Sequence, residues 1–159
     1  MTNNDILRRI RSIFDLSDTT LIEIFELAGV SVSQEQVISW LRKDTDQKFH
    51  KCSDSQLATF LNGFINHRRG KKEGAQAEPE QQLTNNIIFR KLKIALDLQA
   101  EDVLEILDLV NICISKHELS ALFRKPGHKH YRECDDRILQ GFLDGVRIMY
   151  NRNVQSETD

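Results

Sequence analysis

The chain has 159 residues and a formal net charge of −2, and 40% of its residues are hydrophobic while 29% are charged. This balance is typical of a soluble globular protein and excludes a uniformly basic surface for nucleic acid or membranes. No apolar run reaches the roughly 18 residues of a membrane-spanning helix, no secretory signal opens the chain, and the three cysteines have no paired spacing. We therefore expect a cytoplasmic protein with reduced thiols and no membrane contact.

Apolar residues recur every three or four positions along residues 2–70, as they do in helices that bury one face. They fall into four groups, which predicts four helices. The groups are Ile6, Ile10, Ile13 and Phe14; Leu21, Ile24, Phe25 and Ala28; Val37, Trp40 and Leu41; and Leu57, Phe60, Leu61 and Phe64. Ser33 with Gln36, and Ser53 with Gln56, fit capping boxes at the starts of the third and fourth helices.

Residues 71–83 are polar, contain one of the two prolines and have no apolar period, which predicts a linker. Beyond it, residues 84–152 align with residues 2–70 without a gap, at a constant offset of 82 positions. Identical pairs include Asp15 and Asp97, Ser33 and Ser115, Cys52 and Cys134, Phe60 and Phe142, and Gly63 and Gly145. The four apolar groups recur as well, so the second copy is predicted to form the same four helices. Residues 153–159 are polar again, and we expect a disordered tail there.

These patterns predict an all-α fold made by tandem duplication of a four-helix domain. We expect four large apolar side chains to be buried: Trp40, Phe60, Leu122 and Phe142. A four-helix unit of this size has a thin core and would be marginally stable alone. We therefore expect the two copies to pack against each other in a pseudo-twofold arrangement.

Several blocks of the sequence resemble the YehS family, bacterial proteins that carry a duplicated domain of unknown function. The blocks are the opening Thr-Asn-Asn-Asp-Ile-Leu-Arg-Arg-Ile-Arg, residues 52–54, residues 60–63 and residues 128–134. The resemblance covers the chain from Thr2 to about Arg152. It implies a bacterial cytoplasmic protein and supplies neither an activity nor catalytic residues.

Cysteine and histidine suggest a metal site in the second copy, where His128, His130 and Cys134 form His-x-His-x3-Cys. A structural zinc site needs four ligands, and the first copy has an aspartate and a lysine at the histidine positions. Packing explains the cysteines more simply, because Cys52 and Cys134 precede predicted helix caps, where a small hydrophobe is favoured. We expect both thiols to be buried and no metal to be bound.

The sequence contains no Gly-x-Ser-x-Gly elbow, no phosphate-binding loop and no His-Glu-x2-His. Acidic residues such as Glu23 and Glu105 lie within amphipathic helices and are expected to face water. We therefore expect no enzymatic activity and no cofactor. Gly63 and Gly145 stand inside the predicted fourth helices, which indicates a close approach of another helix. Tight packing within each domain is the simpler explanation, and contact between the copies is the alternative.

A basic loop follows the third predicted helix of each copy, and each loop also holds one aromatic residue. The candidate nucleic-acid-binding residues are Arg42, Lys43, Lys48, Arg124, Lys125 and Lys129. Such side chains neutralise phosphates, and Phe49 or Tyr131 could stack on a base. The preceding helices resemble a helix-turn-helix in outline, although the turn from Gly29 to Ser33 is longer than a tight one. Aspartates in the first loop favour an ordinary solvated loop.

The preferred hypothesis is a non-enzymatic helical binding module for a protein partner. It follows from the absence of a reaction centre and from a duplicated scaffold whose copies can present related faces. The alternative is a nucleic-acid-binding regulator that uses the basic loops of both copies.

Overall fold

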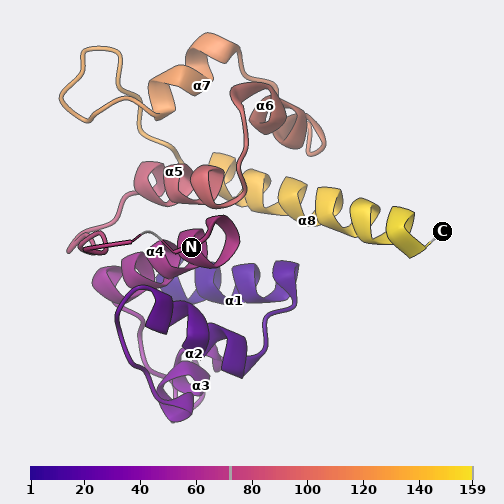
Figure 1. Ribbon diagram of the computed structural model, residues 1–159. Coiled ribbons are helices and arrows are strands. Elements are labelled where there is room, and N and C mark those ends of the chain that lie inside the picture. Colours follow the sequence, from indigo (N-terminus) through magenta and orange to yellow (C-terminus); the bar gives the residue numbers. More distant parts are fainter. Residues whose placement is uncertain (72, 159) are drawn as a thin grey trace. The chain divides into compact units, whose positions relative to one another are not determined.

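The computed structural model describes residues 1–71 and 73–158. Within these residues the chain forms eight helices and no strand, so the predicted all-α fold is confirmed (Figure 1). The chain divides into two compact units, Met1–Leu83 and Thr84–Asp159, each with four helices. The pseudo-twofold arrangement of the two copies stays a prediction. No helix in the described part of the chain is long and apolar enough to cross a membrane.

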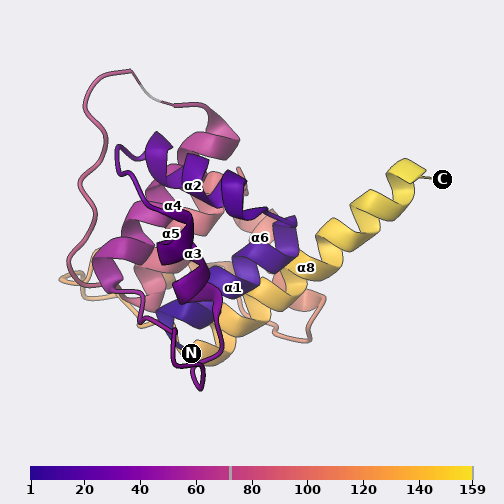
Figure 2. The same cartoon turned by 90° about the horizontal axis from the view of Figure 1, so that it is seen from below.

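The helices of the two units correspond one to one in chain order. They are α1 (Asn3–Phe14), α2 (Asp18–Leu27), α3 (Gln34–Leu41) and α4 (Asp54–Arg69), followed by α5 (Asn85–Ala95), α6 (Ala100–Asp108), α7 (Lys116–Leu122) and α8 (Asp136–Thr158). In the first unit α2 packs against α3 and α4, and α1 contacts both α3 and α4 (Figure 2). In the second unit α6 packs between α7 and α8, and α5 contacts α8.

Side-chain caps explain where several helices begin. Capping boxes form at Ser53, as predicted, and at Ser115, the counterpart of Ser33. In each box the serine oxygen accepts the N–H of the residue at the third helical position, and the side chain of that residue accepts the serine N–H. The Ser33 oxygen accepts the N–H of Gln36. A further capping box, at Thr2, starts α1 and was not predicted from the sequence. Hydrogen bonds between residues close in the sequence therefore define these helix starts.

The predicted core residues are buried in both units: Trp40 and Leu122 are each 2% exposed, and Phe60 and Phe142 are fully covered. Cys52 and Cys134, which precede the helix caps, are buried as well, as expected. Large apolar side chains from every helix thus form one core in each unit, and their burial is the main stabilising contribution to the fold.

The helix glycines mark the closest contact within each unit. A β-carbon added at Gly63 would collide with the backbone carbonyl oxygen of Ile24, and one at Gly145 would collide with that of Ile106. These carbonyls belong to α2 and α6, so the glycines let α4 and α8 approach a neighbouring helix of the same unit. Tight packing within the domain, rather than contact between copies, explains both positions.

The segments outside the repeats differ from expectation in one place. The described residues of the linker 71–83 return along α4, since Gln76 accepts from the side chain of Asn66 and the Leu83 N–H donates to Asp54. The expected disordered tail is instead helical, because α8 continues to Thr158. Residues 153–158 contain no proline or glycine, and each residue added to an existing helix gains a hydrogen bond. Residues 72 and 159 lie outside the described residues.

Candidate functional site

A buried asparagine in the first turn of each unit fixes the ends of the loop after its third helix. Asn4 donates from Nδ2 to the carbonyl oxygens of Trp40 and His50, each at 2.9 Å, and its Oδ1 accepts the N–H of Cys52 at 3.0 Å. Asn86 makes the equivalent three bonds in the second unit, at 2.8 to 2.9 Å. The ends of the two loops are therefore held by the same three hydrogen bonds, and any difference between the loops lies in their own residues.

No role was predicted for these asparagines from the sequence. The signal was available, because an asparagine recurs at the same register of both copies, on the face that buries Leu7. A polar side chain on such a face is expected to bond to backbone groups.

In the first unit the basic loop carries its own counter-ions. Asp46 pairs with Arg42 at 3.0 Å and accepts the backbone N–H of Lys48 at 2.8 Å. The Lys48 amide, followed by the Arg42 guanidinium, lowers the pKa of the Asp46 carboxyl. Asp44 lies 3.3 Å from Arg8 of α1. The predicted cation Arg42 is therefore neutralised within its own loop.

A second ion pair lies in the same unit, between the end of α1 and the start of α2. Arg11 near the end of α1 lies 3.2 Å from Asp18, the first residue of α2, and also donates to the carbonyl oxygen of Leu16. Both members are partly exposed. The pair joins the ends of two consecutive helices and neutralises the arginine there.

The second unit keeps the cations of both pairs and lacks both carboxylates. Lys93 and Arg124 stand at the positions of Arg11 and Arg42, while Ala100 and His128 replace the two aspartates. The Nζ of Lys93 lies over the ring of Phe123, 5.2 Å from its centroid. Among the described residues, neither Lys93 nor Arg124 has a carboxylate partner.

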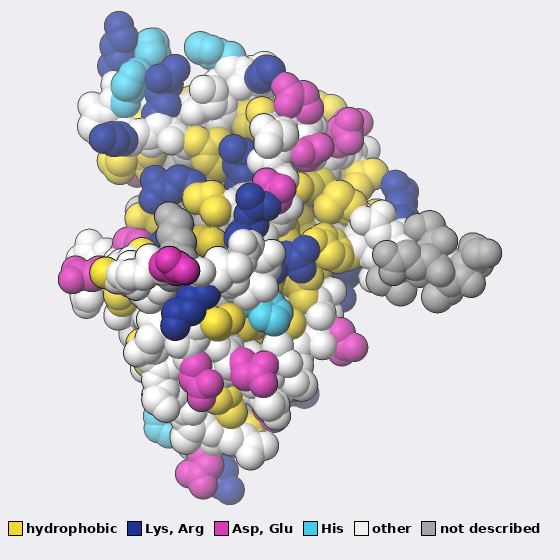
Figure 3. Space-filling model, in the orientation of Figure 1, with side chains coloured by type: hydrophobic (Ala, Val, Ile, Leu, Met, Phe, Trp, Pro, Cys, Tyr) yellow, Lys and Arg dark blue, Asp and Glu magenta, His cyan; other side chains and the backbone are white. Residues whose placement is uncertain are grey.

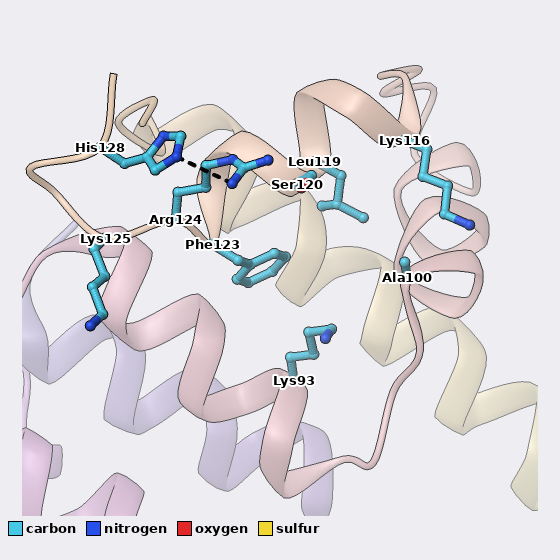
Figure 4. A pocket seen from close by; sticks show the side chains of 9 residues that line it. All are labelled: Lys93, Ala100, Lys116, Leu119, Ser120, Phe123, Arg124, Lys125 and His128. Atoms are coloured by element: carbon cyan, nitrogen blue, oxygen red, sulfur yellow. Dashed lines mark hydrogen bonds between the residues drawn. The ribbon is translucent and has the colours of Figure 1, made fainter. Parts of the chain in front are cut away.

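A groove of about 590 Å³ opens at this place in the second unit (Figure 4). Its cations come from α5, α7 and the following loop: Lys93, Lys116, Arg124 and Lys125. Its apolar side chains are Ala100, Leu119 and Phe123, and Ser120 and His128 complete the lining. No acidic residue lines it, although Lys116 pairs with Glu101 at 2.7 Å outside. In Figure 3 Lys, Arg and His side chains gather over α7 and the loop after it.

The structure therefore separates the six predicted site residues. Arg124 and Lys125 line the groove, and Lys129 is exposed in the same loop but outside the lining. The three predicted residues of the first unit, Arg42, Lys43 and Lys48, stand in a loop that also holds two aspartates. Arg42 pairs with Asp46 there, whereas Lys43 and Lys48 have no carboxylate partner among the described residues. The sequence reading missed Lys93 and Lys116, because it counted charges within one loop and did not compare charge pairs across the offset of 82 positions.

The described residues contain no group of three or more His, Cys, Asp or Glu side chains that could hold a metal ion. His128 and His130 are exposed, whereas Cys134 is buried and its Sγ donates to the carbonyl oxygen of Asp135 at 3.6 Å. Burial, reinforced by neighbouring aspartates, raises the pKa of Cys134 to about 12, and burial also raises that of Cys52 to about 12. Such thiols stay protonated at neutral pH and are poor metal ligands.

Comparison with known proteins identifies the family but no activity. The family model described as "Protein of unknown function (DUF1456)" matches the chain twice, over residues 3–70 and 85–152. The "Uncharacterized protein YehS" of Escherichia coli strain K12 is 43% identical over 147 residues, which cover 92% of this chain and 94% of that protein. No solved structure matches the chain. Two matches to one family model, and a relative aligned over nearly its whole length, show that the chain belongs to the DUF1456, or YehS, family and carries its domain twice.

Proposed function

We propose that this protein is a non-enzymatic binding module whose second repeat holds an acidic segment of a partner protein. The observation that supports this is the loss of two carboxylates. The second repeat keeps the cations Lys93 and Arg124 but has Ala100 and His128 where the first repeat has Asp18 and Asp46. An acidic ligand would supply the missing negative charge.

The mixed lining of the groove favours a protein segment as the ligand. The half-buried side chains of Ala100 and Phe123 offer apolar surface between cations that come from α5, α7 and the loop. An acidic peptide with apolar side chains matches both features, because carboxylates pair with the cations while apolar groups leave water. Charge complementarity of this kind also speeds association.

Nucleic acid is the alternative, and Lys129 beside Arg124 and Lys125 favours it. Two features weigh against it. In the first loop Arg42 is paired with Asp46, so the two loops do not offer the same free cations to a nucleic-acid backbone. The ring of Phe123 has Lys93 over it and meets Phe89 edge-on, with centroids 5.1 Å apart. A ring engaged in this way is a poor platform for stacking a base.

The non-enzymatic part of the proposal rests on the lining of the groove. Its one hydroxyl, Ser120, has no hydrogen bond to a basic group among the described residues. An activated nucleophile needs a base within hydrogen-bond reach. Lysine and arginine side chains without such a partner serve better as charge than as a reaction centre.

Fluorescence anisotropy with three labelled probes tests the proposal. The probes are a peptide rich in Glu and Leu, the same peptide with Gln in place of Glu, and an oligo-dT of similar length. We expect only the Glu peptide to bind near physiological salt, and its affinity to fall as salt rises. The double variant Lys93→Ala with Arg124→Ala should weaken binding by at least about tenfold.

The first repeat provides the matched control, Arg11→Ala with Arg42→Ala, which removes the equivalent cations and should leave peptide binding unchanged. Equal effects of the two double variants would contradict a site confined to the second repeat. Tighter binding of oligo-dT than of the Glu peptide, lost in the second-repeat variant, would establish the nucleic-acid alternative instead.

A further inference from the structure

The ring of His128 has a donor beside each of its two nitrogens, whereas a neutral imidazole has only one acceptor nitrogen. The backbone N–H of His130 points at Nδ1 from 3.0 Å, and an amide N–H can only donate. Nδ1 is therefore the acceptor, and the ring proton lies on Nε2. In the charged ring both nitrogens carry protons, so Nε2 is a donor in that state too.

Arg124 brings a second donor to this Nε2–H group. Its Nη1 lies 3.4 Å from Nε2 of His128, and Figure 4 shows the two side chains next to each other at one end of the groove. A guanidinium has five N–H donors and no acceptor. With the ring proton on Nε2, neither group can accept a hydrogen bond from the other, and an acceptor that bridges them would satisfy both.

The first unit supplies such an acceptor from its own chain. Asp46 stands at the position of His128; its Oδ1 accepts the N–H of Lys48, and its Oδ2 accepts from Nη1 of Arg42 at 3.0 Å. Histidine at this position keeps the first bond, from the amide two residues further on, and turns the second acceptor into a donor. The second unit lacks the one oxygen that the first unit provides.

We infer that Arg124 and His128 form an oxyanion subsite, in which a ligand oxygen occupies the place that an oxygen of Asp46 takes in the first unit. Carboxylates and phosphates have the charge and lone pairs that this requires, and charge-assisted hydrogen bonds to guanidinium are strong. Lys125 lines the same groove and adds positive charge. The natural ligand, a carboxylate of an acidic partner segment, rests on the proposed function; the subsite itself rests on the donor geometry.

Nuclear magnetic resonance of the full chain tests the geometry without a partner. Long-range ¹H–¹⁵N spectra should show His128 protonated at Nε2, and addition of acetate should shift the Nε2 resonance and the side-chain resonances of Arg124. The variant His130→Ala is the matched control, because it keeps the backbone N–H and should give the same spectra. A proton on Nδ1 in the neutral ring, or no shift with acetate or inorganic phosphate, would overturn the subsite. A response to phosphate alone would overturn carboxylate as its ligand.

Binding of the labelled Glu peptide provides the second test. His128→Asp should create in the second unit the equivalent of the Arg42–Asp46 pair. It should lower the affinity for the peptide by about tenfold, since the new carboxylate occupies the subsite. His130→Ala should bind as the wild type does. Equal affinity of the wild type and the His128→Asp variant would refute the subsite and leave the proposed function intact. Acetate shifts at His128 without any peptide binding would do the reverse.

Discussion

The two repeats share the hydrogen bonds that hold the loop after the third helix, and they differ in charge. In both, an asparagine bonds to two carbonyls and one amide at the ends of the loop, with matching partners at the same offset. The first repeat pairs each of two cations with an aspartate, at Arg11–Asp18 and Arg42–Asp46. The second repeat has neither aspartate, and a groove lined by cations lies there.

The difference teaches which positions of a duplicated domain can diverge. A buried asparagine that loses its partners leaves unsatisfied polar groups, which costs about 1 to 3 kcal/mol for each group. A partly exposed ion pair such as Arg11–Asp18 contributes little stability. The second repeat can therefore replace both aspartates without weakening its fold, and the charge that is released becomes available to a ligand.

The largest effect we predict is a difference in thiol reactivity. Cys52 and Cys134 occupy equivalent positions in the two repeats, whereas Cys113 has no cysteine counterpart in the first repeat. Cys52 and Cys134 should react with a thiol reagent at least about a hundredfold more slowly than exposed Cys113 at neutral pH, because burial raises the pKa of both to about 12 and blocks access. Timed labelling with mass spectrometry measures the rates.

A variant refines the thiol test. The carboxylate of Asp108, which lies 3.3 Å from the Cys113 thiol, raises the pKa of that thiol. Asp108→Asn should therefore speed the reaction of Cys113 and leave the other two thiols unchanged. Fast labelling of either buried cysteine in the folded protein would contradict equivalent burial in the two repeats.

Substitution of the two helix glycines should change the free energy of unfolding by similar amounts, because their packing is equivalent in the two repeats. Gly63→Ala and Gly145→Ala should each lower the free energy of unfolding by about 2 to 3 kcal/mol, because the added β-carbon overlaps a backbone carbonyl that cannot easily move. Urea unfolding followed by circular dichroism measures the change. Gly127→Ala is the control, since no atom lies within 4 Å of a β-carbon added there. A neutral effect at either helix position would break the comparison.

Exchanging the charges between repeats should transfer part of the binding. Ala100→Asp with His128→Asp should weaken the Glu peptide by at least about tenfold, because it restores both ion pairs. Asp18→Ala with Asp46→His should add a weaker second site to the first repeat. Titration calorimetry of both double variants measures the number of sites and their affinities. A first-repeat variant that gains no site would show that freeing Arg11 and Arg42 does not by itself make a binding site.

The smallest predicted effect is an acid titration in the first loop. Because the pKa of Asp46 is lowered below its ordinary value of 3.8, its bonds to Arg42 and the Lys48 amide hold above that value and are lost as pH falls through the lowered one. The amide resonance of Lys48 should shift over this range. The equivalent amide of His130 bonds to an imidazole and should show no carboxylate titration. A midpoint at or above the ordinary value would contradict the pairing.

Local pattern made much of the fold predictable. The spacing of apolar residues located all eight helices within the described chain, and serines three residues before Gln36 and Gln56 located two of the caps. Polar composition predicts a disordered tail after residue 152, whereas nothing in that segment stops a helix and α8 continues to Thr158. The candidate site was half predicted: Arg124 and Lys125 stand in one loop, whereas Lys93 and Lys116 come from other helices.

By itself the sequence determined the duplication, the helical class, the buried core and the burial of Cys52 and Cys134, because periodicity and caps act over a few residues along the chain. Tertiary structure alone decided which cations have counter-ions. Arg11 pairs with the first residue of the next helix, whereas Arg42 pairs within its own loop, and only the folded arrangement sets Lys93 and Arg124 around one groove. Electrostatic interaction depends on distance in space rather than along the chain, so a count of charges within one loop could not reveal it.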